Sequence, residues 1–285
     1  MKILLPLLAL PLLTLGPALA HSTGPAGPLD ETGWRTDRAW YDGLAEKCTY
    51  EATRTIYALE RSYVATAYTN KERASSKVTV KDDGGDVEVF KHHWSERVPT
   101  ENYDYDFSTM TYTRASDLTP FKLTASTQDD CGASFKELWR DGGRLRYLES
   151  VYFPGTGRRD GIVRGDADDV VLADALTLTL RDFPFDAPRD LELTVVPSQK
   201  STKPVPYDPE KRVARHAGRQ TLQLPVGAVD AHRIDLVRPD RSVEASYWFA
   251  ADGTAPWLHA LVQYEGPEGI TYRLKTIERT AYWRR

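Results

Sequence analysis

The sequence predicts a mainly β protein: a single, strongly curved antiparallel sheet, shaped like a half-barrel, with one or two short helices. Two observations lead to this prediction. The 285 residues include 15 Tyr and 7 Trp but only 2 Met, and aromatic residues are enriched in strands. From Cys48 onward, apolar and polar residues alternate with a period of two through many consecutive segments separated by short turns. This pattern is typical of an antiparallel meander.

Composition and charge place the chain among ordinary globular proteins. Hydrophobic residues make up 41% of the sequence and charged residues 27%, which argues against disorder over the whole length. Lys and Arg number 37 against 41 Asp and Glu, giving a net charge of −4. Nucleic-acid-binding proteins usually carry a basic excess, so we expect no nucleic-acid partner.

The beginning of the sequence predicts export. Lys2 precedes an apolar run over residues 3–15, and Ala18-Leu19-Ala20 has the small-x-small pattern of a cleavage site. We interpret residues 1–20 as a cleaved signal peptide, because the run is too short to cross about 30 Å of hydrocarbon. The protein is therefore expected in the periplasm or outside the cell, and not as a membrane-spanning chain. Residues 21–33 are rich in Gly and Pro and are predicted to be a flexible leader.

Residues 34–285 are predicted to form one curved antiparallel domain. Trp40 and Leu44, spaced i and i+4, favour a short helix within residues 34–47. Cys48, Tyr50 and Ala52 then begin an alternating strand whose apolar face is interrupted by Arg54. The strands expected in this half of the chain cover residues 48–57, 61–69, 77–81, 87–94, 103–114, 121–127, 134–140 and 144–153.

A long loop over residues 154–169 separates the two halves. Asp168 and Asp169 then precede apolar residues at helical spacing, so a helix is favoured up to about residue 180. Leu176, Leu178 and Leu180 also alternate, which leaves a strand as the alternative. Residues 198–210 form a second long connection, and the strands expected around and after it cover residues 190–196, 212–224, 229–238, 242–250, 257–265 and 270–283.

The carboxy-terminal third resembles a known family. Residues 218–234 read GRQTLQLPVGAVDAHRI, and residues 247–257 read YWFAADGTAPW. Over residues 210–283 this order is similar to a family of exported bacterial domains of unknown function, related in fold to the lipoprotein carriers LolA and LolB. The resemblance implies a half-open antiparallel sheet curled around a helix or plug, with an apolar concavity that holds lipid-modified protein chains in those carriers. The matching residues form turns and packing contacts, so no binding residue carries over.

The densest cluster of polar and aromatic residues suggests a site. His93 and Trp94 end one strand, and Asp104 and Asp106 lie on one face of the next. If the turn centres on Pro99 and Thr100, His93 lies opposite Asp106, and such a pair could transfer protons or bind a metal. The simpler interpretation, which we favour, is a solvent-facing row of charges beside a buried aromatic row. We therefore assign no catalytic or metal-binding residue and expect no cofactor.

Cys48 and Cys131 are the only cysteines in the sequence. In an oxidising compartment, a single pair usually forms a disulfide, which we predict here. The alternative is two buried free thiols.

Three functional hypotheses follow. We favour a non-enzymatic exported domain that binds an apolar or amphipathic ligand, such as a lipid or a lipoprotein-like chain, or an envelope protein. The first alternative is a secreted hydrolase or lyase in which His93 and Asp106 converge. The second is a structural module whose aromatic residues fill its own core. Aromatic residues crowd the last forty positions, and they could line a cavity or fill the core.

Overall fold

A computed structural model of the chain describes residues 33–130 and 132–283. The predicted signal peptide, almost all of the predicted leader and Cys131 lie outside the described residues. The described part is mainly β: its strands form one large sheet in the order β10-β11-β12-β13-β14-β15-β16-β1-β2-β4-β5-β6-β7-β8-β9, with β3 paired to β2. Neighbouring strands are antiparallel except for β10 and β11. The predicted fold class is confirmed.

The first half of the chain starts in the middle of the sheet and runs strand by strand to one edge. The first half comprises β1 (Ala45–Ile56), β2 (Leu59–Ser75), β3 (Val80–Lys81), β4 (Val87–Pro99), β5 (Asp104–Arg114), β6 (Pro120–Asp129), β7 (Gly132–Asp141), β8 (Arg144–Val151) and β9 (Arg158–Ile162). The strand β9 lies within the predicted 154–169 loop, because residues 158–162 pair with β8. Residues 163–170 then cross to the opposite edge of the sheet.

The second half of the chain returns from that edge to the middle. It comprises β10 (Val171–Leu172), β11 (Leu191–Val196), β12 (Glu210–Leu224), β13 (Gly227–Val237), β14 (Val243–Ala250), β15 (Leu261–Glu265) and β16 (Thr271–Thr280). The last strand pairs with β1, so the two ends of the described chain meet in the centre of the sheet. Within the described residues the sheet is not closed, and β9 and β10 are its edges.

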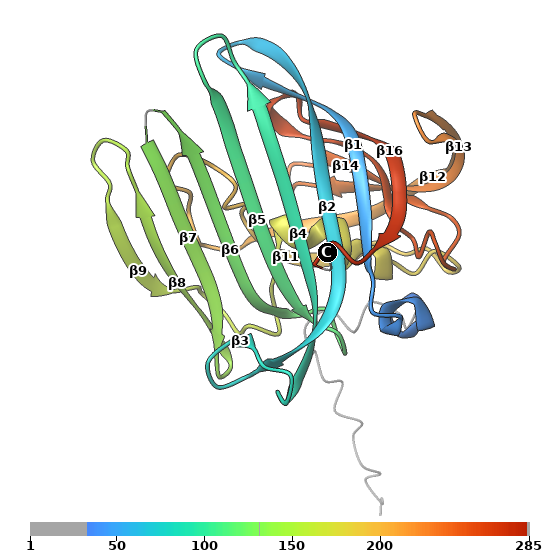
Figure 1. Cartoon of the computed structure of the whole chain (residues 1–285), viewed down its shortest axis with the longest axis horizontal. Coiled ribbons are helices and arrows are strands. Elements are labelled where there is room, and N and C mark those ends of the chain that lie inside the picture. Colours follow the sequence, from blue (N-terminus) through green and yellow to red (C-terminus); the bar gives the residue numbers. More distant parts are fainter. Residues whose placement is uncertain (1–32, 131, 284–285) are drawn as a thin grey trace, which may run out of the picture.

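The sheet curves around a short helical segment (Figure 1). This segment consists of η3 (Ala173–Ala175), α1 (Leu176–Thr179) and η4 (Leu180–Asp182), so the predicted helix is confirmed but is only a few turns long. Leu176, Leu180 and Phe183 pack in the main hydrophobic core, together with the inward-facing residues Cys48 and Tyr50 of β1. The helical segment therefore fills part of the concave side.

The helix predicted over residues 34–47 is wrong in its extent. Residues Gly33–Thr36 (η1) and Arg38–Tyr41 (η2) form two short 3₁₀ turns. Gly43 has φ +75°, which ends the helical path, and Ala45 already pairs with Thr280. Strand pairing in the centre of the sheet thus overrides the helical spacing of the apolar residues. A further 3₁₀ turn, η5 (Pro267–Gly269), joins β15 to β16.

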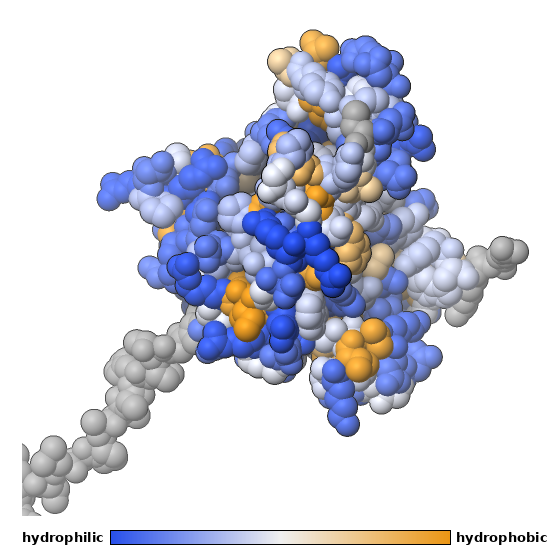
Figure 2. Space-filling view, turned by 90° about the vertical axis from the view of Figure 1, so that its left-hand side faces the viewer, coloured by the Kyte–Doolittle hydropathy of each residue, from blue (hydrophilic) through white to orange (hydrophobic). Residues whose placement is uncertain are grey.

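The β9 edge is protected by charge. Arg158, Arg159 and Asp160 of β9 are exposed, and charged side chains on an edge strand discourage pairing with other chains. Figure 2 shows that this side of the molecule is mostly hydrophilic, with hydrophobic residues in small separate patches. Among the described residues, no helix combines the length and apolar character needed to span a membrane.

Candidate functional site

The structure separates the predicted pair of His93 and Asp106. In the β4–β5 hairpin, Asp106 lies opposite Arg97, and His93 lies opposite Met110. The turn occupies residues 100–103, where the Thr100 N–H donates to the Tyr103 carbonyl at 3.2 Å. This turn shifts the register by four residues from the one predicted with Pro99 and Thr100 at its centre. The predicted juxtaposition is therefore wrong.

Each of these candidates has another partner. Arg97 Nε lies 2.7 Å from Asp104 Oδ2 and 3.8 Å from Asp106 Oδ1, so the two acids do share a face, as predicted. His93 Nε2 lies 3.0 Å from Ser108 Oγ, and burial followed by the Lys91 charge lowers the pKa of His93. In the part of the chain that the structure describes, no group of three or more His, Cys, Asp or Glu side chains is placed to hold a metal ion.

Trp94 is the predicted site residue that reaches a cavity. Its neighbour His93 points to the other face of the strand, whereas Trp94 is buried and stacks on Tyr50 of β1. The indole Nε1 donates to Glu96 Oε1 at 2.8 Å. Trp94 therefore belongs to the concave side of the sheet, where it lines a cavity.

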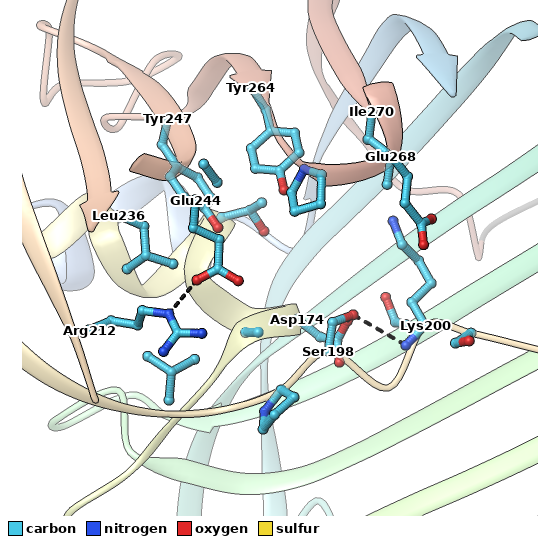
Figure 3. A pocket seen from close by; sticks show the side chains of 18 of the residues that line it. Asp174, Ser198, Lys200, Arg212, Leu236, Glu244, Tyr247, Tyr264, Glu268 and Ile270 are labelled. Atoms are coloured by element: carbon cyan, nitrogen blue, oxygen red, sulfur yellow. Dashed lines mark hydrogen bonds and ion pairs between the residues drawn. The ribbon is translucent and has the colours of Figure 1, made fainter. Parts of the chain in front are cut away.

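This cavity has a volume of about 520 Å³, within the range of about 300–1,000 Å³ usual for small-molecule sites. It lies between strands β12 to β16 and the loop of residues 197–209 that joins β11 to β12 (Figure 3). Its larger apolar and aromatic lining residues are Trp94, Val195, Val205, Leu236, Tyr247, Tyr264, Ile270 and Tyr272. Its charged lining residues are Arg54, Asp174, Lys200, Glu210, Arg212, Arg238, Glu244 and Glu268.

A buried carboxylate, Glu96, organises one wall of the cavity. Glu96 is 2% exposed. Its Oε1 accepts hydrogen bonds from Trp94, from Tyr272 Oη at 2.5 Å and from the Lys200 ammonium, and its Oε2 accepts one from Tyr63 Oη at 3.1 Å. Burial alone would raise the pKa of Glu96, but the Lys200 charge, the hydrogen bonds from Lys200 and Tyr272 and the Arg54 charge lower it below its usual value. Glu96 is therefore held ionised with its oxygens occupied.

A second charged group occupies the opposite wall. Arg212 of β12 donates to Glu244 of β14, as Figure 3 shows, and Arg238 Nη2 lies 3.3 Å from the other oxygen of Glu244. Tyr247 and Tyr264 lie above this group, with their ring centroids 4.9 Å apart. Burial raises the pKa of both tyrosines, so their hydroxyls stay protonated. The cavity thus combines aromatic walls with internally paired charges.

A second cavity of about 420 Å³ adjoins the first. Arg54, Ser201 and Glu268 line both cavities. The second one is lined at its outer end by Tyr57 and Tyr105, whose hydroxyl oxygens lie 2.6 Å apart. The hairpins at this end of the sheet therefore line the second cavity with aromatic rings.

The 197–209 loop is anchored across the concave side by buried groups. Lys136 of β7 is 0% exposed, and its Nζ donates to the carbonyl oxygens of Gln199, Ser201 and Lys203 at 3.2, 3.0 and 2.7 Å. From the helical segment, Asp174 Oδ2 accepts the Gln199 N–H at 2.7 Å. The loop is thereby fixed at the position from which Lys200 reaches Glu96.

Sequence reasoning missed Glu96 and Lys200. Glu96 looks like an ordinary charged residue at a strand end, and Lys200 lies in a Pro-rich loop more than one hundred residues away. One signal did exist for the site: Arg54 interrupts the apolar face of its strand, and a charged residue at such a position must find partners inside the protein.

Cys48 is buried, and no described residue forms a disulfide with it. Its Sγ lies 3.7 Å from Glu46 Oε1, and burial, followed by the Glu46 charge, raises the pKa of the thiol. This environment favours an unreactive thiol. Cys131 lies outside the described residues, so the Cys48–Cys131 disulfide stays a prediction.

The chain is similar to a solved structure of unknown function. No protein-family model matches the chain, and no curated protein matches it. The solved structure is a crystal structure described as a beta-barrel-like protein of the domain of unknown function DUF1849, from Brucella abortus. The two chains are 9% identical, the match covers 83% of this chain and 98% of the other, and the TM-score is 0.49.

Proposed function

We propose that this chain is an exported, non-enzymatic domain that binds an apolar or amphipathic ligand on the concave side of its sheet. The observation that supports this most is the cavity of about 520 Å³, with Trp94, Leu236, Tyr247 and Tyr264 in its walls. Ligand sites are typically concave and largely apolar, with a few placed polar groups. The resemblance of residues 210–283 to a family related in fold to LolA and LolB supports the same function.

The arrangement of the charged groups favours binding over catalysis. Glu96 already accepts hydrogen bonds from four side chains, and Glu244 is paired with two arginines. The hydrolase or lyase alternative depends on His93 and Asp106. His93 lies four residues along β4 from Arg97, the residue opposite Asp106, and four residues of strand span about 13 Å. That distance is too long for direct proton transfer between the two side chains.

Export follows from the proposed signal peptide over residues 1–20. We expect the protein in the periplasm or outside the cell, with a first residue of His21. Intact mass and amino-terminal sequencing of the protein from its native cells test this. A product that retains Met1 would contradict the proposal.

Ligand binding is tested on protein purified from its native envelope. We expect extraction followed by mass spectrometry to find a lipid or another amphiphile. The variant Val205→Trp places a large ring in the cavity lining and should carry much less of it. The control is Val78→Trp, at a residue that is 64% exposed and outside this lining. Ligand-free wild-type protein that also fails to take up added amphiphiles would reject the proposed function.

A further inference from the structure

Arg54 occupies an unusual place on the concave side. Arg54 carries a charge, yet it is only 7% exposed. It lies on the inward face of β1, in line with Cys48, Tyr50 and Ala52. It is also one of the residues shared by the two cavities. A buried arginine at the junction of two cavities is poorly explained by packing alone, because the charge must be compensated there.

The compensation of Arg54 is incomplete. Its Nη2 donates to Glu268 Oε2 at 2.9 Å. Its Nη1 is buried and makes no hydrogen bond to any described residue; the Oε2 atom of Glu96 lies 3.8 Å away. The guanidinium also lies over the Phe107 ring, with Cζ 4.3 Å from the centroid. One face of the guanidinium is thus held in place, while one of its buried donors makes no hydrogen bond to a described residue.

The two acids that face Arg54 differ in burial, and the exposed one can be exchanged for an incoming anion. Arg54 and Lys200 both face Glu96, so two cations share one buried carboxylate. The other acid on Arg54, Glu268, has a side chain that is 64% exposed and is carried by the short turn η5. When Glu268 is displaced, its exposed carboxylate returns to water, and the incoming acid keeps the buried Arg54 charge paired. An incoming acidic group can therefore replace Glu268 at low cost.

We propose that the ligand is a single-chain amphiphile with an acidic head group, a carboxylate or a phosphate, bound by Arg54. The guanidinium fork suits both groups because it can donate two parallel hydrogen bonds. Lys200 adds a second positive charge. The chain of the ligand lies in the larger cavity, against Leu236, Tyr247 and Ile270. This inference rests on the proposed function and adds the chemical class of the ligand.

Isothermal titration with three matched twelve-carbon ligands tests the inference: dodecanoate, dodecyl phosphate and the neutral dodecanamide, all below their aggregation concentrations. We expect at least one acidic ligand to bind about tenfold or more tightly than the amide, the size expected for a hydrogen bond to a charged group. The ratio of dodecanoate to dodecyl phosphate affinity then identifies the preferred head group. The variant Arg54→Gln should weaken the acidic ligands far more than the amide and so remove the advantage of the acidic ligands.

Two further variants make the result specific. Glu268→Gln removes the exposed carboxylate that competes for Arg54, and it should raise the affinity for the acidic ligands. Arg97→Gln removes a positive charge outside both cavities and should change nothing. The inference is overturned if the amide binds as tightly as both acids. It is also overturned if Arg54→Gln weakens all three ligands equally while Glu268→Gln has no effect. In both cases the proposed function stands. If none of the three ligands binds, both are overturned.

Discussion

Arg181 donates to both carboxylate oxygens of Glu46, at 2.6 and 3.0 Å, and each residue is 1% exposed. Arg181 belongs to η4 and Glu46 to β1, so this bidentate pair fixes the helical segment to the central strand of the sheet. The guanidinium also lies 5.8 Å from the ring centroid of Trp34. The pair thus sets how the segment that carries Asp174 is placed beside the cavity.

We predict that Arg181→Met lowers the free energy of unfolding by about 3–5 kcal/mol, because it leaves the Glu46 carboxylate buried without its partner. Urea denaturation followed by tryptophan fluorescence measures this. The control is Lys47→Met, which removes the Lys47–Glu278 pair on a more exposed face and should cost about 0–1 kcal/mol. A loss below about 1 kcal/mol for Arg181→Met would show that the pair does not hold the segment.

His92 predicts a dependence of stability on pH. The side chain is buried between Thr69 Oγ1 at 2.8 Å and Thr177 Oγ1 at 3.0 Å. Burial, followed by the charges of Arg181 and His93, lowers the pKa of His92 from 6.5 to about 3. Between these values the unfolded chain binds a proton that the folded chain does not. The contribution of His92 is therefore fully present above pH 6.5 and is lost as the pH falls towards about 3.

The variant His92→Gln should remove this part of the pH dependence. We expect the free energy of unfolding of the wild type to fall more steeply than that of the variant below pH 6.5, by at most about 1.4 kcal/mol per pH unit. Denaturant titrations of both proteins at a series of pH values from 7 to 4 measure the difference. Parallel curves for the two proteins would contradict the prediction.

The fold could be predicted because alternation and turns are local signals. The apolar face of β1, with Cys48, Tyr50 and Ala52, is visible in the sequence, and the structure buries these residues. The helical spacing over residues 34–47 is misleading, since β1 begins at Ala45, which pairs with Thr280 near the far end of the sequence.

The cavity could not be predicted for the same physical reason. Its residues come from β1, β4, β5, β11, the helical segment, the 197–209 loop and strands β12 to β16, and no spacing in the sequence connects them. The predicted pair of His93 and Asp106 failed because register in a hairpin depends on the turn. A four-residue shift at residues 100–103 placed Arg97, rather than His93, opposite Asp106.

The last prediction concerns the loop that covers the cavity. Lys136 is the only described side chain that donates to three carbonyl oxygens of residues 197–209. Lys136→Met keeps the apolar stem of the side chain and removes the three donors, so the loop should open more often. We expect amide hydrogen exchange over residues 198–205 to become at least about tenfold faster, since lost hydrogen bonds to a charged group are worth about 1.5–3 kcal/mol. Exchange in β13 and β14 should stay unchanged.

The matched control is Lys122→Met on the neighbouring strand β6, where Lys122 pairs with Glu137 at 2.8 Å outside the cavity. Equal exchange rates over the loop in both variants and the wild type would show that other contacts hold the loop in place.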